Sequence, residues 1–420
     1  MARPRAVVVV TGSELVRGAQ RDLNGPFLAS ELLRLGVDPG RIVIVGDQPA
    51  ELEQAIREGL EADVCVLSGG LGPTHDDRTI ELLARLTGRG LGVEPNLEAE
   101  IESFSRSVAE RLGRPYGDFA AGVRKQAQVP AGSFVLGLAG TAPGILLEHD
   151  ARVAIALPGP PAELRRLWPA AIAAEPFRQI LARARPRGHR LLRFFGPSES
   201  AVARVLDEAG GEGAGVEVTV CARNLEIHVD LLAEEGSEQR AHELERALVR
   251  RFRDDLFAES ETTIEEIVLG LCRSRRLTLA TAESCTGGMV GSRLTDVAGA
   301  SDVYLGGVVA YADDVKRRAL GISTELLATN GAVSAETAAA MAQGVRRVIG
   351  ADVGAAVTGI AGPGGGSLEK PVGLVFVHAD TPEGSDGRRI DLPGDRETIR
   401  RRATAIVLHL LRGLLSPPRD

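Results

Sequence analysis

The feature that most constrains the fold is an alternation of short apolar runs with helical stretches at the start of the chain. Ala6–Val10 is an apolar strand-like run, Asn24–Leu35 has helical periodicity, and Arg41–Val45 is a second strand-like run. Glu51–Leu60 and Val64–Leu67 continue the series as a helix and a third strand. This order of elements predicts a parallel sheet with helices on both faces.

The same alternation returns in the last part of the chain, after a stretch of different character. A strand at 278–282 and a helix at 289–297 begin this second series, and residues 171–258 have the pattern of a small α+β module. We therefore predict an α/β protein with two separate layered domains, 1–170 and 259–420, which have parallel-rich sheets and are joined by that module. The aromatic content of only 3% favours this class, because cores of Ala, Val, Leu and Ile suit helices packed on parallel strands.

The overall charge argues against a nucleic-acid partner. Lys and Arg total 49 while Asp and Glu total 57, so the net charge is −8, whereas phosphate backbones need a basic face. The run Arg400–Arg402 is either a local anion site or a solvated helix face. The four cysteines form no C-x-x-C pair, which disfavours a zinc site. Because no apolar run reaches the ~18 residues of a membrane span, we expect a cytoplasmic protein with no membrane partner.

The segment AESCTGG follows the first strand of the last domain and precedes a helix. Ser284 and Thr286 lie in this turn, and Gly287 and Gly288 let backbone N–H groups approach a ligand closely. Such a turn suits an exposed nucleophile with an oxyanion site, or a phosphate cradle. An ordinary helix N-cap is the competing interpretation. Cys285 is the second candidate nucleophile, because no histidine lies nearby in sequence to activate it.

A tyrosine and a lysine follow the next strand of this domain. The strand ends near Tyr311, and Lys316 lies on the helix after it. Ser284 would need a base, and a lysine removed from water can take its proton while a tyrosine orients it. A solvated position is the usual alternative for a lone lysine on a helix. Only His378 and His409 fall in this domain, and neither lies in a Gly-rich turn, which disfavours a Ser-His-Asp triad.

A Gly-rich segment, VTGIAGPGGGSLEKPVG, follows a later strand. The N–H groups of glycines such as Gly362 and Gly364 could cup a phosphate, or the segment is simply a flexible loop. Its polar candidates are Thr358 and Lys370. Arg396 begins the last helix, where an arginine can pair with a phosphate or carboxylate.

The first domain carries its own glycine-rich loop, SGGLGPTHDDRT, after its third strand. Ligands of parallel sheets bind beyond the carboxyl ends of the strands, so this loop and TGSELVRG lie where a ligand is expected. Adjacent carboxylates on such a loop suit phosphate chemistry assisted by a divalent metal, or they cap the next helix. The candidate residues are Gly69, Gly70, Gly72 and Thr74 for the substrate and Glu14, Asp76 and Asp77 for the metal.

Taken together, these motifs resemble a known family. AESCTGG, GGVVAYADDVK, VTGIAGPGGGS and PGDRE resemble the CinA C-terminal domain, the nicotinamide-nucleotide amidohydrolase family. The resemblance implies that the last domain converts nicotinamide mononucleotide and water to nicotinate mononucleotide and ammonia, without a cofactor, in pyridine nucleotide recycling. By hypothesis Ser284 attacks the amide carbon or orients water, Lys316 is its base, and Tyr311 and Thr358 hold the polar network. The substrate-binding positions are Thr286, Gly287, Gly288, Gly362, Gly364 and Arg396.

SGGLGPTHDD, GTAPG and LPGPPAEL resemble the CinA N-terminal domain, which is similar to molybdopterin-binding proteins of the MoaB/MogA type. The resemblance implies an ADP-ribose pyrophosphatase that depends on Mg²⁺, Mn²⁺ or Co²⁺, and a homodimer. Val16 and Leu23 depart from the family's usual first loop, whereas Glu14, Asp22 and Asn24 agree with it. Two alternatives stay open: an amidohydrolase whose N-terminal domain only binds a nucleotide or pterin, and a non-catalytic adaptor linked to competence. The expected partners are small nucleotide substrates.

Overall fold

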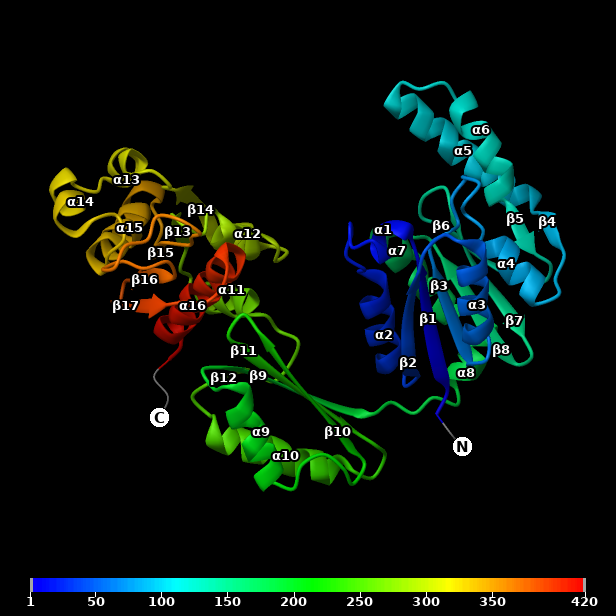
Figure 1. Cartoon of the computed structure of the whole chain (residues 1–420), viewed down its shortest axis with the longest axis horizontal. Coiled ribbons are helices and arrows are strands. Elements are labelled where there is room, and N and C mark those ends of the chain that lie inside the picture. The colour runs from blue at the N-terminus through cyan, green and yellow to red at the C-terminus, as the bar shows by residue number, and fades with distance from the viewer. Residues whose placement is uncertain (1–2, 418–420) are drawn as a thin grey trace. The chain divides into compact units, whose positions relative to one another are not determined.

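The computed structural model describes residues 3–417, which form two compact units that divide between Arg187 and Gly188 (Figure 1). The first unit therefore extends beyond residue 170, the boundary expected from the sequence. Among the described residues, no helix combines the length and the hydropathy of a membrane-spanning segment.

The first unit is built on a six-stranded sheet with the order β2-β1-β3-β8-β7-β6. The strands from β2 to β8 are parallel, and β7 and β6 are antiparallel to their neighbours, so the sheet is mixed. The α/β class is thus confirmed, with an antiparallel edge added to the predicted parallel core. The strands are β1 (Arg5–Thr11), β2 (Asp38–Val45), β3 (Val64–Ser68), β6 (Phe134–Leu138), β7 (Pro143–His149) and β8 (Arg152–Leu157).

The central strand β1 is buried on both faces. Val8 and Val10 belong to one hydrophobic core and Val7 and Val9 to the other, because successive side chains of a strand point to opposite faces. Helices therefore cover both faces, as the uninterrupted valine run predicts. One layer contains α2 (Asn24–Arg34), α7 (Pro161–Ala173) and α8 (Glu175–Leu181), and the other contains α3 (Pro49–Gly59) and α4 (Thr79–Leu86).

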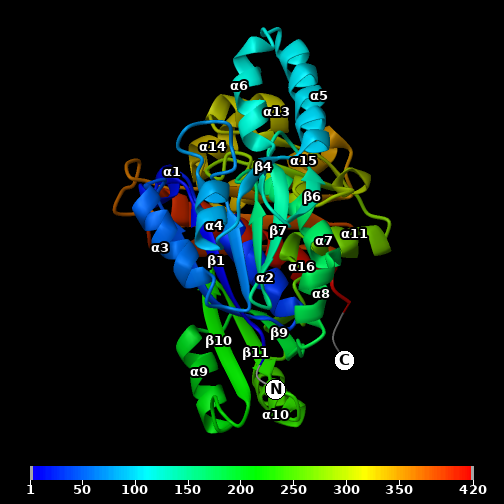
Figure 2. The same ribbon diagram turned by 90° about the vertical axis from the view of Figure 1, so that its right-hand side faces the viewer.

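A helical hairpin that the sequence patterns did not predict projects from this unit (Figure 2). It consists of α5 (Pro95–Leu112) and α6 (Gly117–Gln126), with the short strands β4 (Leu91–Val93) and β5 (Gln128–Pro130) at its base. Its separate small core includes Leu97, which is buried against α6. The short helix α1 (Ser13–Val16) follows β1.

The second unit begins with a small antiparallel sheet, β10-β11-β9-β12, as the α+β pattern predicts. Both of its helices pack on this sheet through a common core that includes Phe194 and Leu244. The elements are β9 (Gly188–Phe195), α9 (Glu199–Glu208), β10 (Val216–Arg223), β11 (Glu226–Ala233), α10 (Glu238–Arg251) and β12 (Leu256–Ala258).

The rest of the second unit is a five-stranded mixed sheet with the order β14-β13-β15-β16-β17. The first three strands are parallel, and β16 and β17 form an antiparallel edge. The strands are β13 (Leu279–Glu283), β14 (Tyr304–Val309), β15 (Val353–Gly359), β16 (Leu374–Thr381) and β17 (Gly384–Asp391). One core contains α11 (Ile264–Ser274), α12 (Met289–Thr295) and α16 (Arg396–Leu415), and the other contains α13 (Asp313–Leu320), α14 (Thr324–Asn330) and α15 (Ala335–Ile349).

Candidate active sites

Ser284 lies at the carboxyl ends of three neighbouring parallel strands. It follows β13 directly, and its backbone N–H donates to the carbonyl of Val357 in β15 at 2.9 Å. On the other side, the N–H of Ala310 at the end of β14 donates to the carbonyl of Glu283 at 2.8 Å. Only 7% of Ser284 is exposed. The strand ends therefore hold this serine at the edge where parallel sheets bind ligands.

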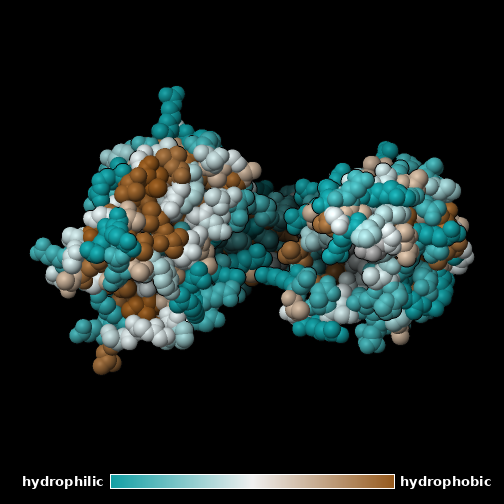
Figure 3. All heavy atoms as spheres, turned by 90° about the horizontal axis from the view of Figure 1, so that it is seen from above, coloured by the Kyte–Doolittle hydropathy of each residue, from teal (hydrophilic) through white to brown (hydrophobic). Residues whose placement is uncertain are grey.

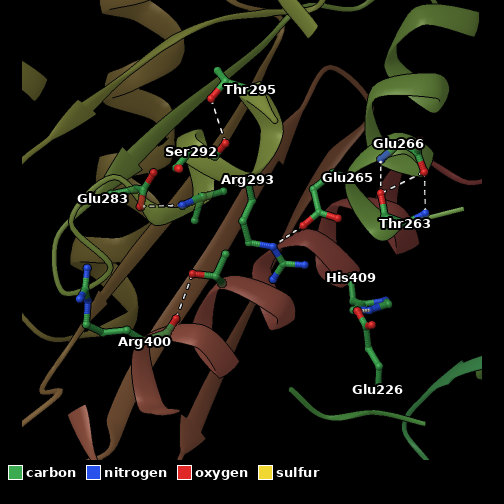
Figure 4. A network of polar contacts seen from close by, with 12 residues as sticks. Glu226, Thr263, Glu265, Glu266, Glu283, Ser292, Arg293, Thr295, Arg400 and His409 are labelled. Atoms are coloured by element: carbon green, nitrogen blue, oxygen red, sulfur yellow. Dashed lines mark hydrogen bonds and ion pairs between the residues drawn. The ribbon is translucent and has the colours of Figure 1, made fainter. Parts of the chain in front are cut away.

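The buried carboxylate of Glu283 organises the turn after the strand (Figure 4). It accepts hydrogen bonds from the N–H groups of Gly288, Val290 and Gly291 at 3.0, 3.0 and 2.8 Å, and so caps α12. The N–H of Gly287 donates to the carbonyl of Ser284 at 3.1 Å. The N–H groups of Gly287 and Gly288, which were expected to bind a ligand, are thus engaged within the loop itself.

Arg400 holds the same loop from the last helix. Its Nε donates to the carbonyl of Cys285 at 3.0 Å and its Nη2 to that of Thr286 at 2.6 Å. The hydroxyl of Thr286 is fully buried and has no hydrogen-bond partner within the described residues. A buried polar atom of this kind marks a place where a ligand or water satisfies it. Sequence reasoning had noted the arginine run at 400–402 but not this contact.

Lys316 is buried on α13 at the same edge of the sheet, with only 1% of the residue exposed. Its Nζ lies 3.4 Å from the carbonyl of Tyr311 and 3.3 Å from Oδ1 of Asp313, so both hydrogen bonds are long.

Burial raises the pKa of the Cys285 thiol to about 12, which leaves little thiolate at neutral pH. Cys285 is therefore poorly suited to act as a nucleophile.

Arg396 joins two other predicted positions. Its Nη2 donates to the hydroxyl of Tyr311 at 2.7 Å and its Nη1 to the carbonyl of Gly362 at 2.7 Å. Tyr311 is 59% exposed, so this group forms an accessible rim. Gly364 lies exposed further along the same loop. The structure therefore brings together Tyr311, Arg396 and the glycine-rich loop.

Thr358 and Lys370 have supporting contacts. The hydroxyl of Thr358 is fully buried and donates to the carbonyl of Ala332 at 2.7 Å. The Nζ of Lys370 donates to the carbonyls of Asn330 and Val333, both at 2.8 Å. These bonds tie the strand β15 and the glycine-rich loop to the segment before α15, and they place Thr358 in a structural network.

The second candidate site is a pocket of about 630 Å³ at the carboxyl ends of β1 and β3. Thr74 is not among its lining residues. Its hydroxyl instead lies between Asp76 and Oδ2 of Asp77, 2.5 Å from the latter, and donates its one proton to this carboxylate pair. The other predicted positions all line the pocket, namely Gly69, Gly70, Gly72, Glu14, Asp76 and Asp77.

Further polar residues also line this pocket, among them Asp47 and Glu163, which the sequence analysis did not single out, and Asp22 and Asn24, which agree with the family's usual first loop. Asp47 accepts from the N–H of Ser13 at 2.9 Å. Its position just after β2 is the same signal that identified the other loops. Asn24 donates to the carbonyl of Gly159 at 2.6 Å, and its buried Oδ1 has no partner within the described residues. Burial raises the pKa of the Glu163 carboxyl.

The three predicted metal ligands of this pocket do not gather into one site. Glu14, Asp76 and Asp77 all line it, yet nowhere in residues 3–417 do three His, Cys, Asp or Glu side chains gather as a metal site. Their oxygen donors have the chemistry that Mg²⁺ prefers. A three-carboxylate centre is therefore absent from the part of the chain described here, whereas one or two carboxylates with substrate phosphates fit the usual binding of Mg²⁺.

Comparison with protein families divides the chain into three consecutive parts. Residues 7–176 match the probable molybdopterin binding domain, residues 189–260 match the damage-inducible protein CinA KH domain, and residues 261–415 match the CinA C-terminal domain. The small α+β module is thus similar to a KH domain, and the resemblance of the two larger domains is confirmed.

Relatives similar along the whole chain support the same conclusion. A CinA-like protein of Mycolicibacterium gilvum (strain PYR-GCK) is 42% identical over 423 residues, which cover 98% of this chain and 99% of the relative. A CinA-like protein of Mycobacterium avium (strain 104) is 42% identical over 432 residues, with 98% of both chains covered. The crystal structure of competence/damage inducible protein CihA from Agrobacterium tumefaciens is 40% identical, with 38% of this chain and 100% of that chain covered and a TM-score of 0.36. Because the two CinA-like relatives are 42% identical over 98% of this chain, the chain belongs to the family of CinA-like proteins.

Proposed function

We propose that the C-terminal domain hydrolyses the amide of nicotinamide mononucleotide to nicotinate mononucleotide and ammonia. The observation that supports this proposal is that Ser284 and Lys316 are each buried at the same edge of one sheet, where Arg396 and Tyr311 form an accessible rim. A serine needs a base to attack an amide carbon, and we assign this role to Lys316 because it is buried at the same edge of the sheet.

In this mechanism the oxygen of Ser284 adds to the amide carbon as Lys316 takes its proton. The same proton passes to the nitrogen, the C–N bond breaks, and ammonia leaves an acyl ester on Ser284. Water then attacks that ester, which yields nicotinate mononucleotide and restores the serine. The hydroxyl of Thr286, which has no hydrogen-bond partner among the described residues, is the donor for the oxyanion, and the guanidinium of Arg396 is the partner for the phosphate.

The test is ammonia release from nicotinamide mononucleotide by the full chain. We expect Ser284→Ala and Lys316→Met to lose at least about a thousandfold in kcat, whereas Ser292→Ala on α12 keeps wild-type activity. Circular dichroism checks that each variant is folded. A folded Lys316→Met variant with full activity would contradict the assignment of the base.

We propose a second activity, metal-dependent hydrolysis of the diphosphate of ADP-ribose, for the N-terminal domain. The observation that favours it is the pocket beyond β1 and β3, which glycine-rich backbone and several carboxylates line together. Asp76 and Asp77 would hold a divalent ion that neutralises the diphosphate. The raised pKa of Glu163 suits it to exchange a proton with water or a leaving phosphate.

Incubation with ADP-ribose and Mg²⁺, Mn²⁺ or Co²⁺ tests this activity by release of AMP. We expect Asp77→Asn and Glu163→Gln to lose it while ammonia release from nicotinamide mononucleotide stays unchanged. Binding of ADP-ribose without turnover by the wild-type chain would instead support a domain that only binds nucleotides or pterins.

A further inference from the structure

A second cleft lies within the second unit, between the KH domain and the C-terminal domain. Its volume is about 1080 Å³, and its walls come from the β10–β11 turn, β17 and the last half of α16. It shares no lining residue with the loop of Ser284 or with Arg396. This cleft is therefore separate from the proposed amidase site of the same unit.

The charge of this cleft is opposite to that of the whole chain. Two aspartates, Asp255 and Asp386, line it together with five arginines, whereas the chain has a net charge of −8. Such a local positive field attracts anions and raises their concentration at the site. The arginines are Arg223, Arg388, Arg389, Arg402 and Arg412.

Three of these arginines, Arg388, Arg389 and Arg402, are only weakly compensated. Arg388 pairs with Asp386 at 2.8 Å, but the Arg388 side chain is 62% exposed, so this pair contributes little. Arg389 lies 4.0 Å from Asp391, with both side chains 62% exposed. Nη1 of Arg402 donates to the carbonyl of Pro393 at 2.7 Å, and a carbonyl does not neutralise the guanidinium charge. These groups can therefore still bind an anion through paired N–H donors.

Apolar side chains form the remaining wall of the cleft, among them Phe195, Leu225 and Ile406. The backbone of the β10–β11 turn is unusual here, because Asn224 and Leu225 both have positive φ angles, of 50° and 74°. This left-handed pair is the geometry of a tight two-residue hairpin turn. This left-handed conformation is less favourable for a leucine than for a glycine, and it places Leu225 beside the arginines of the cleft.

His409 provides an independent sign of a ligand. It lines the cleft and is 4% exposed, its Nε2 lies 2.9 Å from Oε1 of Glu226, and its ring stacks on Phe195 at 3.8 Å (Figure 4). Its Nδ1 is buried and has no hydrogen-bond partner within residues 3–417. An unsatisfied buried nitrogen is costly, so this atom beside the cleft is a place that a bound ligand or water would satisfy.

We propose that this cleft binds a nucleoside diphosphate or a molecule of the same chemistry, which combines two phosphates with a planar base. The arginines match the phosphates, and the apolar wall beside Phe195 matches the base. The volume is that of a pocket for a small organic ligand. This site goes beyond the two proposed activities, because neither proposed substrate site includes any of its residues.

Equilibrium dialysis of the full chain with ADP, pyrophosphate and adenosine as probes tests the proposal. The N-terminal pocket also accepts ADP in our proposal, so the decisive quantity is the difference between variants. We expect the double variant Arg388→Gln/Arg402→Gln to bind one ADP per chain fewer than the wild type, or to bind that one at least about tenfold more weakly. Arg401→Gln is the matched control, because Arg401 pairs with Glu397 on the same helix and does not line the cleft.

Two further results are expected if the cleft is as proposed. ADP binds more tightly than pyrophosphate, and adenosine, which has the base but no phosphates, competes with ADP only weakly. The double variant keeps ammonia release from nicotinamide mononucleotide, so a failure of the amidase proposal remains distinguishable from a failure here.

Three outcomes would overturn the proposal. The first is an unchanged number of bound ADP molecules in a folded double variant, and the second is an equal loss in Arg401→Gln. The third is tight displacement of the cleft-bound ADP by a single-stranded decanucleotide, which would mark the cleft as a nucleic-acid surface instead.

Discussion

Replacement of Glu283 by glutamine should strongly destabilise the C-terminal domain, because one buried carboxylate accepts three backbone hydrogen bonds. The amide oxygen of glutamine can keep the bonds from Gly288 and Val290, but its NH₂ group then faces the N–H of Gly291. One unsatisfied buried donor costs about 1–3 kcal/mol. The two remaining bonds lose their charge assistance, at about 1 kcal/mol each. The sum is roughly 3–5 kcal/mol.

Differential scanning calorimetry of the full chain measures this loss. For a domain of this size, 3–5 kcal/mol corresponds to a decrease in the melting temperature of roughly 6–20 °C. Hydrogen exchange, followed by mass spectrometry, should increase in the peptide that contains α12. Glu266→Gln is the control, since Glu266 is exposed at the start of α11 and glutamine preserves its capping bond to Thr263. A Glu283→Gln protein that melts within about 1 °C of the wild type would refute this account of the loop.

Three further expectations concern buried thiols, one hydroxyl and one strand. Burial raises the pKa values of Cys65 and Cys285 from 9.0 to about 12. Between these pH values the two thiols ionise only in the unfolded chain, so their contribution to the free energy of unfolding is complete below pH 9 and is lost as the pH approaches 12. Denaturation measured at a series of pH values should show this loss. Thr358→Val removes the bond to the carbonyl of Ala332 and should cost about 1 kcal/mol in urea denaturation. Hydrophobic residues gather on one face of the second unit (Figure 3). Leu305 on the edge strand β14 is 47% exposed. We therefore expect light scattering to report a dimer, and we expect Leu305→Arg to weaken that dimer.

The sequence predicted the elements whose signals are local. The valine run at 6–10 and the turn at 283–288 were placed within one or two residues of β1 and α12, because strand burial and the strand-to-turn transition depend on neighbouring residues. The same local rule predicts that loops after β1, β3, β13 and β14 meet at sheet edges. The same rule also predicts that Asp47, which follows β2, lies at the edge of the sheet. A single acidic residue is, however, a weaker sequence signal than the adjacent pair Asp76 and Asp77.

Features that depend on distant partners were missed. Arg400 contacts Cys285 across 115 positions of the chain, and no local pattern shows such a pairing. The hairpin of α5 and α6 has its own small core, so it does not continue the alternation that identified the sheet. The strand β17 has a polar, glycine-containing sequence, and its pairing with β16 rather than its composition makes it a strand.

The position of Ser284 does not depend on bound substrate, because separate elements hold its loop. Val357 of β15 binds its N–H, Glu283 caps the helix that follows, and Arg400 binds the two carbonyls after it. A serine held in this way needs little reorganisation before attack, which is how preorganised sites lower a barrier. Arg400→Lys should therefore reduce kcat more than it raises KM, since a lysine cannot reach both carbonyls with a planar fork. An Arg400→Lys enzyme with wild-type kcat and a raised KM would instead place Arg400 in direct contact with the substrate.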